Sequence, residues 1–143
     1  MDFNTTLKNY YKTKSDIRSC ILKQQELREL GGFPKTGAND GMPKSNNHGS
    51  YIEHFLERLE ELETKQIELE QILFGIQLDL ERFLAVIKTT PSLESNFAIK
   101  QVCEYRIFLG YGWKTISHKI DKSYSYTRSL YDLGIRIMRG VVL

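Results

Sequence analysis

The chain has 143 residues, with a hydrophobic share of 41%, a charged share of 27% and a formal net charge of +2. This composition is ordinary for one soluble domain, or for a small domain with an extension. No run of about 18 apolar residues occurs, which excludes a transmembrane helix. The first residues also lack the basic-then-apolar order of a signal peptide. We therefore expect a cytoplasmic protein without a membrane partner.

The charge is distributed unevenly along the chain. Residues 1–48 have a net charge of +3, residues 49–90 a net charge of −5, and residues 97–143 a net charge of +5. An acidic middle and a basic end indicate that different stretches face different partners. The basic end is the part that would attract phosphate groups.

Residues 4–30 contain no proline or glycine, and their apolar residues recur close to helical spacing. This pattern predicts a first helix, which Gly31 and Gly32 end. Residues 31–49 are rich in glycine, proline and asparagine and hold few apolar side chains, so we expect a flexible loop there.

A heptad repeat follows the loop. Steps of three and four residues from Ile52 to Ile87 visit eleven positions, ten of them apolar and only Gln66 polar. A 3.5-residue repeat keeps one side of a helix aimed at a partner helix, as in a coiled coil. The expected oligomerisation residues are Ile52, Phe55, Leu59, Leu62, Gln66, Leu69, Leu73, Ile76, Leu80 and Phe83.

This second helix is expected to begin with a capping box of Ser50 and Glu53 and to end near Lys88, before Pro91. Further apolar residues flank the repeat, so its apolar stripe is wider than a two-stranded coil needs. The simplest partner is the first helix, folded back antiparallel, with a second chain covering the remainder. We therefore expect a homodimer.

The basic end has the plan of a helix-turn-helix. Residues 96–110 form a predicted helix, 113–120 a short one and 121–123 a polar turn. A last helix starts at Tyr124, with Ser123 as its N-cap. Ser117 supplies the small residue that a close helix crossing needs.

In this plan the last helix buries Thr127, Leu130 and Gly134 and presents a polar face. Arginine binds guanine in two hydrogen bonds, serine and tyrosine donate to bases or phosphates, and lysines near the turn meet the backbone. Packing of the tyrosines against the protein is the alternative to a reading role. The expected DNA-binding residues are Trp113, Lys114, Thr115, Lys119, Lys122, Ser123, Tyr124, Ser125, Tyr126, Arg128, Ser129, Asp132 and Arg136.

Residues 105–117, YRIFLGYGWKTIS, resemble the "RYIEGLSWEEIA" stretch of phage-encoded late transcription regulators of the RinA/ArpU type. Residues 123–128, SYSYTR, resemble the recognition helix of those regulators, and residues 41–44, GMPK, resemble a stretch of their glycine- and proline-containing loop. The resemblance extends loosely over residues 5–139. Thr127 departs from it where an aliphatic residue is usual, and Gly134 where alanine is usual.

The resemblance implies a C-terminal unit similar to the fourth region of bacterial sigma factors, which reads promoter DNA. It implies double-stranded DNA as the partner, with RNA polymerase as a further candidate. Together with the residue patterns, it favours a phage-encoded, sequence-specific transcriptional regulator that binds as a dimer.

The expected fold is all-α. Residues 1–90 form a helical hairpin with a coiled coil for oligomerisation, and residues 91–143 form the helix-turn-helix unit. Two other function classes stay open: a small terminase-like DNA-packaging subunit, and a protein that binds or inhibits another protein through the acidic helix.

Residue types with catalytic or metal chemistry are not arranged for either. The histidines His48, His54 and His118 have no metal-ligand spacing to one another or to a cysteine. Cys20 and Cys103 are far apart and are expected to be small core residues in a reducing compartment. The glutamate pairs of the acidic helix are typical of solvated coiled-coil flanks. We expect no enzyme activity, metal or cofactor.

Overall fold

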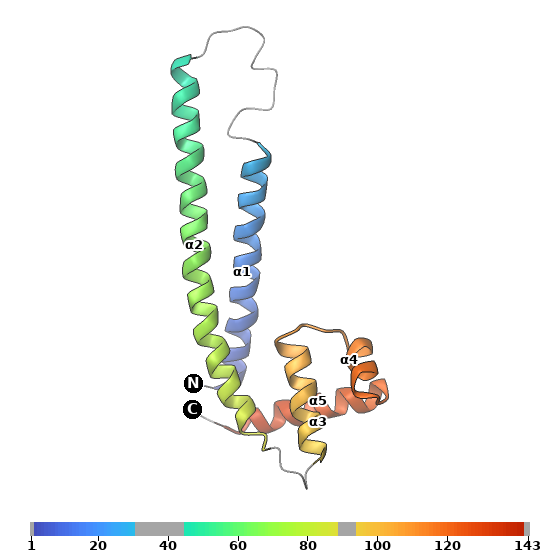
Figure 1. Cartoon of the computed structure of the whole chain (residues 1–143). Coiled ribbons are helices and arrows are strands. Elements are labelled where there is room, and N and C mark those ends of the chain that lie inside the picture. The colour runs from blue at the N-terminus through green and yellow to red at the C-terminus, as the bar shows by residue number, and fades with distance from the viewer. Residues whose placement is uncertain (1, 31–44, 89–93, 142–143) are drawn as a thin grey trace. The chain divides into compact units, whose positions relative to one another are not determined.

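The computed structural model describes residues 2–30, 45–88 and 94–141. Those residues form five α-helices and no strand, so the predicted all-α class is confirmed (Figure 1). None of these helices is long and apolar enough to cross a membrane. The helices are α1 (Phe3–Glu29), α2 (Ser45–Ala85), α3 (Glu94–Ile107), α4 (Trp113–Ile120) and α5 (Tyr124–Arg139).

The bounds of α2 correct three sequence expectations, namely its capping box, the end of the preceding loop and the end of the helix near Lys88. The helix begins at Ser45, so Ser50 lies inside it and the predicted capping box at Ser50 is wrong. Of the predicted loop 31–49, residues 45–49 are helical, and residues 31–44 lie outside the described residues. The helix also ends at Ala85, because the next two backbone N–H groups bond three residues back, as in a 3₁₀ turn.

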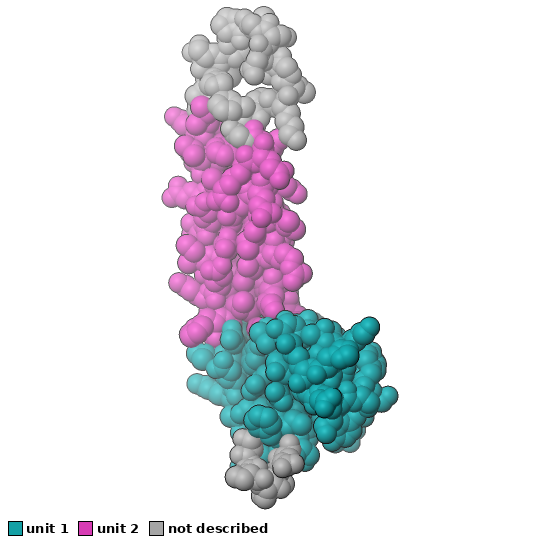
Figure 2. Space-filling view, turned by 45° about the vertical axis from the view of Figure 1, so that its right-hand side comes forward, with its two compact units in different colours: residues 1–9, 76–143 teal, residues 10–75 magenta. Residues whose placement is uncertain are grey.

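The chain divides into two compact units, coloured separately in Figure 2. Unit 1 comprises residues 1–9 and 76–143, and unit 2 comprises residues 10–75. The units divide within both long helices, because the end of α2 and the start of α1 contribute side chains to the core beside α3–α5. The functional division at residue 90 expected from the sequence stays a prediction.

Unit 2 is an antiparallel pair of helices (Figure 1). Between residues 51 and 75 the seven heptad positions of α2 are partly buried and every other position is exposed. On α1 the facing positions follow the same three-and-four spacing: Tyr10, Thr13, Ile17, Cys20, Gln24 and Leu27. The predicted heptad face of α2 is therefore occupied by α1 of the same chain.

Polar groups fix the register of this helix pair. The side-chain amide of Gln24 is buried and donates to Gln66 Oε1 at 2.7 Å. The Cys20 thiol donates to the backbone oxygen of Leu62 at 3.0 Å. A polar pair inside an apolar seam favours one register, because any shift leaves its amide groups without partners.

The core of unit 1 combines segments from both ends of the chain. Phe3 is buried against Phe83, with the ring centroids 5.5 Å apart. Residues of α3, α4 and α5 complete this core: Ile99, Val102, Cys103, Ile107, Ile116, Leu130, Ile135 and Met138 are all buried. At the surface, Arg139 Nε donates to Asn4 Oδ1 at 2.9 Å.

Candidate nucleic-acid interface

A tight turn joins α4 to α5. Asp121 adopts the left-handed conformation, with φ of 55° and ψ of 50°. The N–H of Asp121 donates to His118 O at 3.3 Å and that of Lys122 to Ser117 O at 3.0 Å. These bonds satisfy the last carbonyl groups of α4, as in a helix C-cap, and let three residues reverse the chain. The structure thus has the predicted helix–turn–helix order.

The start of α5 is fixed by a cap. As predicted, Ser123 is the N-cap, and its Oγ accepts a hydrogen bond from the N–H of Tyr126 at 3.2 Å. Thr127 is fully buried, and its hydroxyl donates to Ser123 O at 2.8 Å. This bond gives the buried hydroxyl group of Thr127 a partner.

Small residues allow close helix crossings here. Ser117 is buried in α4, and its Oγ donates within the helix to Lys114 O at 2.7 Å. Gly134 brings α5 close to α3: a Cβ atom at this position would overlap Sγ of Cys103 and lie 3.0 Å from Cγ2 of Ile99. The predicted buried stripe of α5 is therefore present, and Gly134 is its closest point of packing.

The outward face of α5 is polar. Ser125, Ser129, Asp132 and Arg136 recur at helical spacing, and all four side chains are exposed. They lie opposite the buried stripe, where α5 could enter a groove. Tyr126 is exposed on one flank of this face, where the Lys122 ammonium lies 5.9 Å from its ring centroid.

An aromatic–arginine cluster joins α3, α4 and α5 of unit 1. The Arg128 guanidinium carbon lies 5.4 Å from the centroid of the Trp113 ring, and that of Arg106 lies 4.4 Å from it. Arg106 also donates to the backbone oxygen of Tyr111 at 3.0 Å, and the Tyr131 ring meets Trp113 edge-on at 5.0 Å. Trp113 thus holds the guanidinium group of Arg128, a predicted reading residue, in a cation–π contact.

The α4 residues lie on two sides of their helix. Lys114 and Thr115 are exposed, as predicted for phosphate contacts. Lys119 is also exposed, but its ammonium lies 5.2 Å from the Tyr111 ring centroid and 6.0 Å from that of Tyr105. These cation–π contacts hold Lys119 beside the loop that precedes α4, on the opposite flank from Lys114.

Thus all thirteen predicted DNA-binding residues lie on α4, the turn or α5 of unit 1. Twelve are exposed and Trp113 is half-buried. Of this set, Lys122 and Ser123 belong to the turn, and Tyr124 is the first residue of α5. Their contact with DNA stays a prediction.

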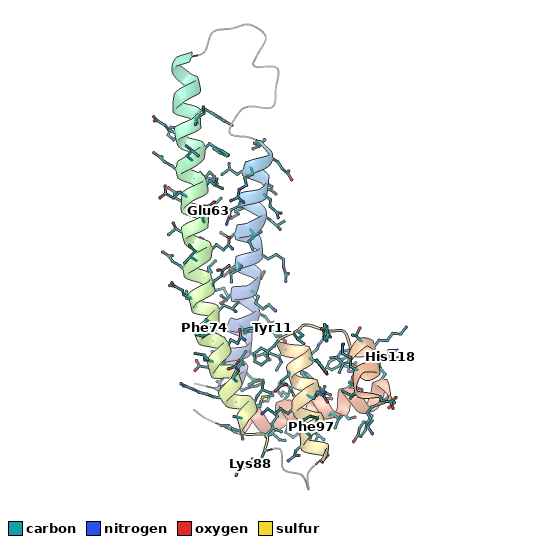
Figure 3. The ribbon with its side chains drawn as sticks, in the orientation of Figure 1. Tyr11, Glu63, Phe74, Lys88, Phe97 and His118 are labelled. Atoms are coloured by element: carbon teal, nitrogen blue, oxygen red, sulfur yellow. The ribbon has the colours of Figure 1, made fainter. Side chains whose placement is uncertain are left out.

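Sequence reasoning missed two residues of this surface. Arg106 lies in the last turn of α3 and contacts Trp113, but a loop whose course the sequence pattern does not reveal separates it from α4. His118 is exposed on α4, one helical turn after Lys114 (Figure 3). Its helical spacing to Lys114 was the signal that could have identified it.

The predicted oligomerisation residues are placed differently in the two units. The seven from Ile52 to Leu73 line the face of α2 that meets α1 in unit 2. Ile76, Leu80 and Phe83 belong to unit 1, where the last two are buried in the core. Their role between chains stays a prediction.

Cys103 is buried in the core of unit 1. Burial raises the pKa of the Cys103 thiol to about 12, so it stays protonated and weakly nucleophilic at neutral pH. Among the described residues no group of three or more histidine, cysteine or acidic side chains could hold a metal ion. Comparisons of the chain with protein-family models, curated proteins and solved structures find no match.

Proposed function

We propose that this protein is a sequence-specific DNA-binding regulator of transcription that acts as a dimer. The observation that carries the proposal is the outward face of α5. This face is polar and exposed, and it lies on the side of α5 opposite the buried stripe. Basic residues of α4 and the turn flank it. A helix of this kind fits the major groove of B-DNA, which is about 12 Å wide.

The residue types suit distinct tasks at such an interface. Arg128 offers two parallel donors to guanine, while Ser125 and Ser129 donate to or accept from base edges, and Asp132 accepts from cytosine. Lys114 and Lys122 would contact phosphates and fix the register of the protein on the duplex. Because the Trp113 ring already holds the Arg128 guanidinium in a cation–π contact, fewer rotamers would be lost on binding.

The sequence supports the proposal independently of the geometry. Residues 97–143 have a net charge of +5, which favours a polyanion. The resemblance to phage late transcription regulators covers the end of α3, α4 and the start of α5, and extends loosely over residues 5–139. It supports a phage-encoded regulator, with RNA polymerase as a second partner.

Fluorescence polarisation with fragments of the source genome tests this function. Arg128→Ala is expected to reduce discrimination between the best fragment and a scrambled one by roughly 5- to 150-fold, the equivalent of about 1–3 kcal/mol. Lys114→Ala is expected to weaken binding to both fragments alike and to lower the salt slope by about 1.

Lys23→Ala is the matched control, since Lys23 is an exposed lysine of α1 far along the chain from the interface. It should change neither affinity nor discrimination. Equal affinity of the unsubstituted protein for all fragments at moderate salt would contradict the proposal. A ring of eight or more copies in light scattering would favour a DNA-packaging subunit instead.

A further inference from the structure

The apolar seam of unit 2 is already filled, so a second chain needs another surface. The heptad positions of α2 face those of α1, and the Gln24–Gln66 bond lies between them. A partner that used this seam would have to displace α1. The side of the helix pair, formed by both helices together, is what remains.

One side of unit 2, which we call the lateral face, is marked by the ion pair between Arg28 and Glu63, 2.8 Å apart. In an antiparallel pair the positions just outside the seam on this side belong to both helices. On α1 they carry Lys14, Arg18 and Arg28 and no acidic residue, together with Tyr11 and Ile21.

The α2 part of the lateral face has the opposite charge. It carries Glu60, Glu63 and Glu70 and no basic residue. Between these acids stand exposed apolar side chains, namely Leu56, Ile67 and Phe74. Phe74 is 63% exposed, and Figure 3 labels it on α2 at the same level as Tyr11 on α1.

The opposite side of unit 2 lacks this organisation. Each helix there mixes both signs of charge, with Lys12, Asp16 and Lys23 on α1 and Arg58, Glu61 and Lys65 on α2. Its apolar residues are Tyr51 and Ile72. Charge separation between the two helices, combined with a run of apolar side chains, is therefore specific to the lateral face.

We propose that the lateral face binds the lateral face of a second copy of this chain, forming a four-helix bundle. A twofold axis parallel to the helices sets α1 of one copy beside α2 of the other. Basic positions then meet acidic ones, and the apolar residues of both copies are buried together. A twofold axis across the helices would instead set α1 against α1 and α2 against α2, where like charges repel.

This arrangement also gives the two copies the same direction. Both α2 helices then end at the same end of the bundle and lead there into the residues of α3–α5. The inference supplies the surface for the dimer included in the proposed function. It is tested without DNA, so its failure is distinguishable from a failure of DNA binding.

A charge exchange between two chains tests the pairing. In the proposed bundle Arg18 of one copy lies at the level of Glu70 of the other, given the register that Gln24 and Gln66 set. Arg18→Glu places two like-charged pairs in its own dimer, and so does Glu70→Arg. Each variant alone should dimerise at least tenfold more weakly than the unsubstituted protein in sedimentation equilibrium.

Mixing the two variants should restore the dimer, because every facing pair in the mixed dimer again has opposite charges. Within each chain the exchanged residue still meets its original neighbours, so only contact between chains explains a rescue. Circular dichroism of each variant confirms that the helices are formed. A mixture that stays monomeric while both variants are folded would overturn the proposal.

A second experiment tests the apolar part of the face. Phe74→Glu should weaken dimerisation at least tenfold, whereas Ile72→Glu should leave it unchanged. Ile72 is a fair control because it is 54% exposed on the opposite side of the same helix. An equal effect of both substitutions would also overturn the proposal. So would an unsubstituted protein that is monomeric at about 100 micromolar.

Discussion

The close packing of α5 against α3 depends on the hydrogen atom that serves as the side chain of Gly134. Gly134 carries no Cβ, and Cys103 and Ile99 occupy the space that a Cβ would need. Both neighbours are buried, and isoleucine is branched at Cβ, so neither can move aside easily. The residue that departs from the alanine of the resembling regulators is therefore matched to its neighbour across the helix crossing.

Gly134→Ala is expected to lower the free energy of unfolding by about 1–3 kcal/mol, because overpacking outweighs the gain in helix propensity. Gly75→Ala is the matched control. Gly75 is also helical, but a Cβ there meets no atom within 4 Å. This control should raise stability by about 0.5–1 kcal/mol. Urea unfolding measures both values, and a stabilising Gly134→Ala would contradict the packing argument.

At the scale of elements, the polar pair in the seam of unit 2 lowers the stability of the helix pair but specifies its register. Gln24 is buried and donates to Gln66, which in turn donates to Glu70 Oε1 at 2.8 Å. A hydrogen-bonded amide pair contributes less than apolar residues of the same size would, but it penalises shifted pairings.

Gln24→Ala is expected to lower the free energy of unfolding by about 1–3 kcal/mol, since it leaves the Gln66 carbonyl without its donor. The double variant Gln24→Leu/Gln66→Leu is expected to be at least as stable as the original protein. Gln71→Ala, at an exposed position of α2 outside the seam and the lateral face, serves as the control. Urea unfolding checks the order, and a double variant less stable than Gln24→Ala would contradict it.

The sequence predicted those elements whose local signals agree. The heptad of α2 was visible because ten of its eleven positions are apolar. The bounds of α4 and the cap at Ser123 were also predicted correctly, since glycines precede α4 and a serine follows the turn. The seam of α1 was less visible because Thr13 and Gln24 occupy two of its positions, and only the bond from Gln24 to Gln66 of α2 explains the glutamine.

The start of α2 and the surroundings of Trp113 were not predictable in the same way. Ser50 has the residue type of a cap, yet the helix begins at Ser45. A residue type that favours the cap position does not by itself fix where a helix begins. The contact between Arg106 and Trp113 depends on how the loop between α3 and α4 turns back. No periodicity in the sequence records such a contact.

At the scale of the whole molecule, the unit that carries the proposed DNA surface depends on the beginning of the chain. Phe3 is 1% exposed and packs against Phe83, within the same unit as α3–α5. Thr6, one helical turn after Phe3, is also buried, and its hydroxyl donates to Asp2 O at 2.8 Å. The first helical turns are thus part of the core of unit 1.

Phe3→Ala is expected to destabilise unit 1 by about 3–5 kcal/mol, through loss of buried apolar surface and the cavity that remains. Hydrogen exchange should then become faster in peptides from α3 and α5, far from the substitution in sequence. Phe97→Ala should leave exchange unchanged, because Phe97 is 60% exposed in α3. Unaltered protection of α5 in the Phe3 variant would show that the N-terminal turns are dispensable.

The closure of unit 1 by both ends of the chain has a consequence during synthesis on the ribosome. Arg139 and Asn4, which share a hydrogen bond, are 135 residues apart in the sequence. At a translation rate of about 5–20 residues per second, roughly 7 to 27 seconds pass between the synthesis of the start of α1 and that of the end of α5, which share this core. Thr13 and Gln24 on the seam of α1 make this helix, while it is exposed, less prone to associate with other apolar surfaces than a leucine-rich helix would be. A nascent chain that stops before α5 cannot close this unit, so the proposed DNA surface would arise only after translation has passed residue 139.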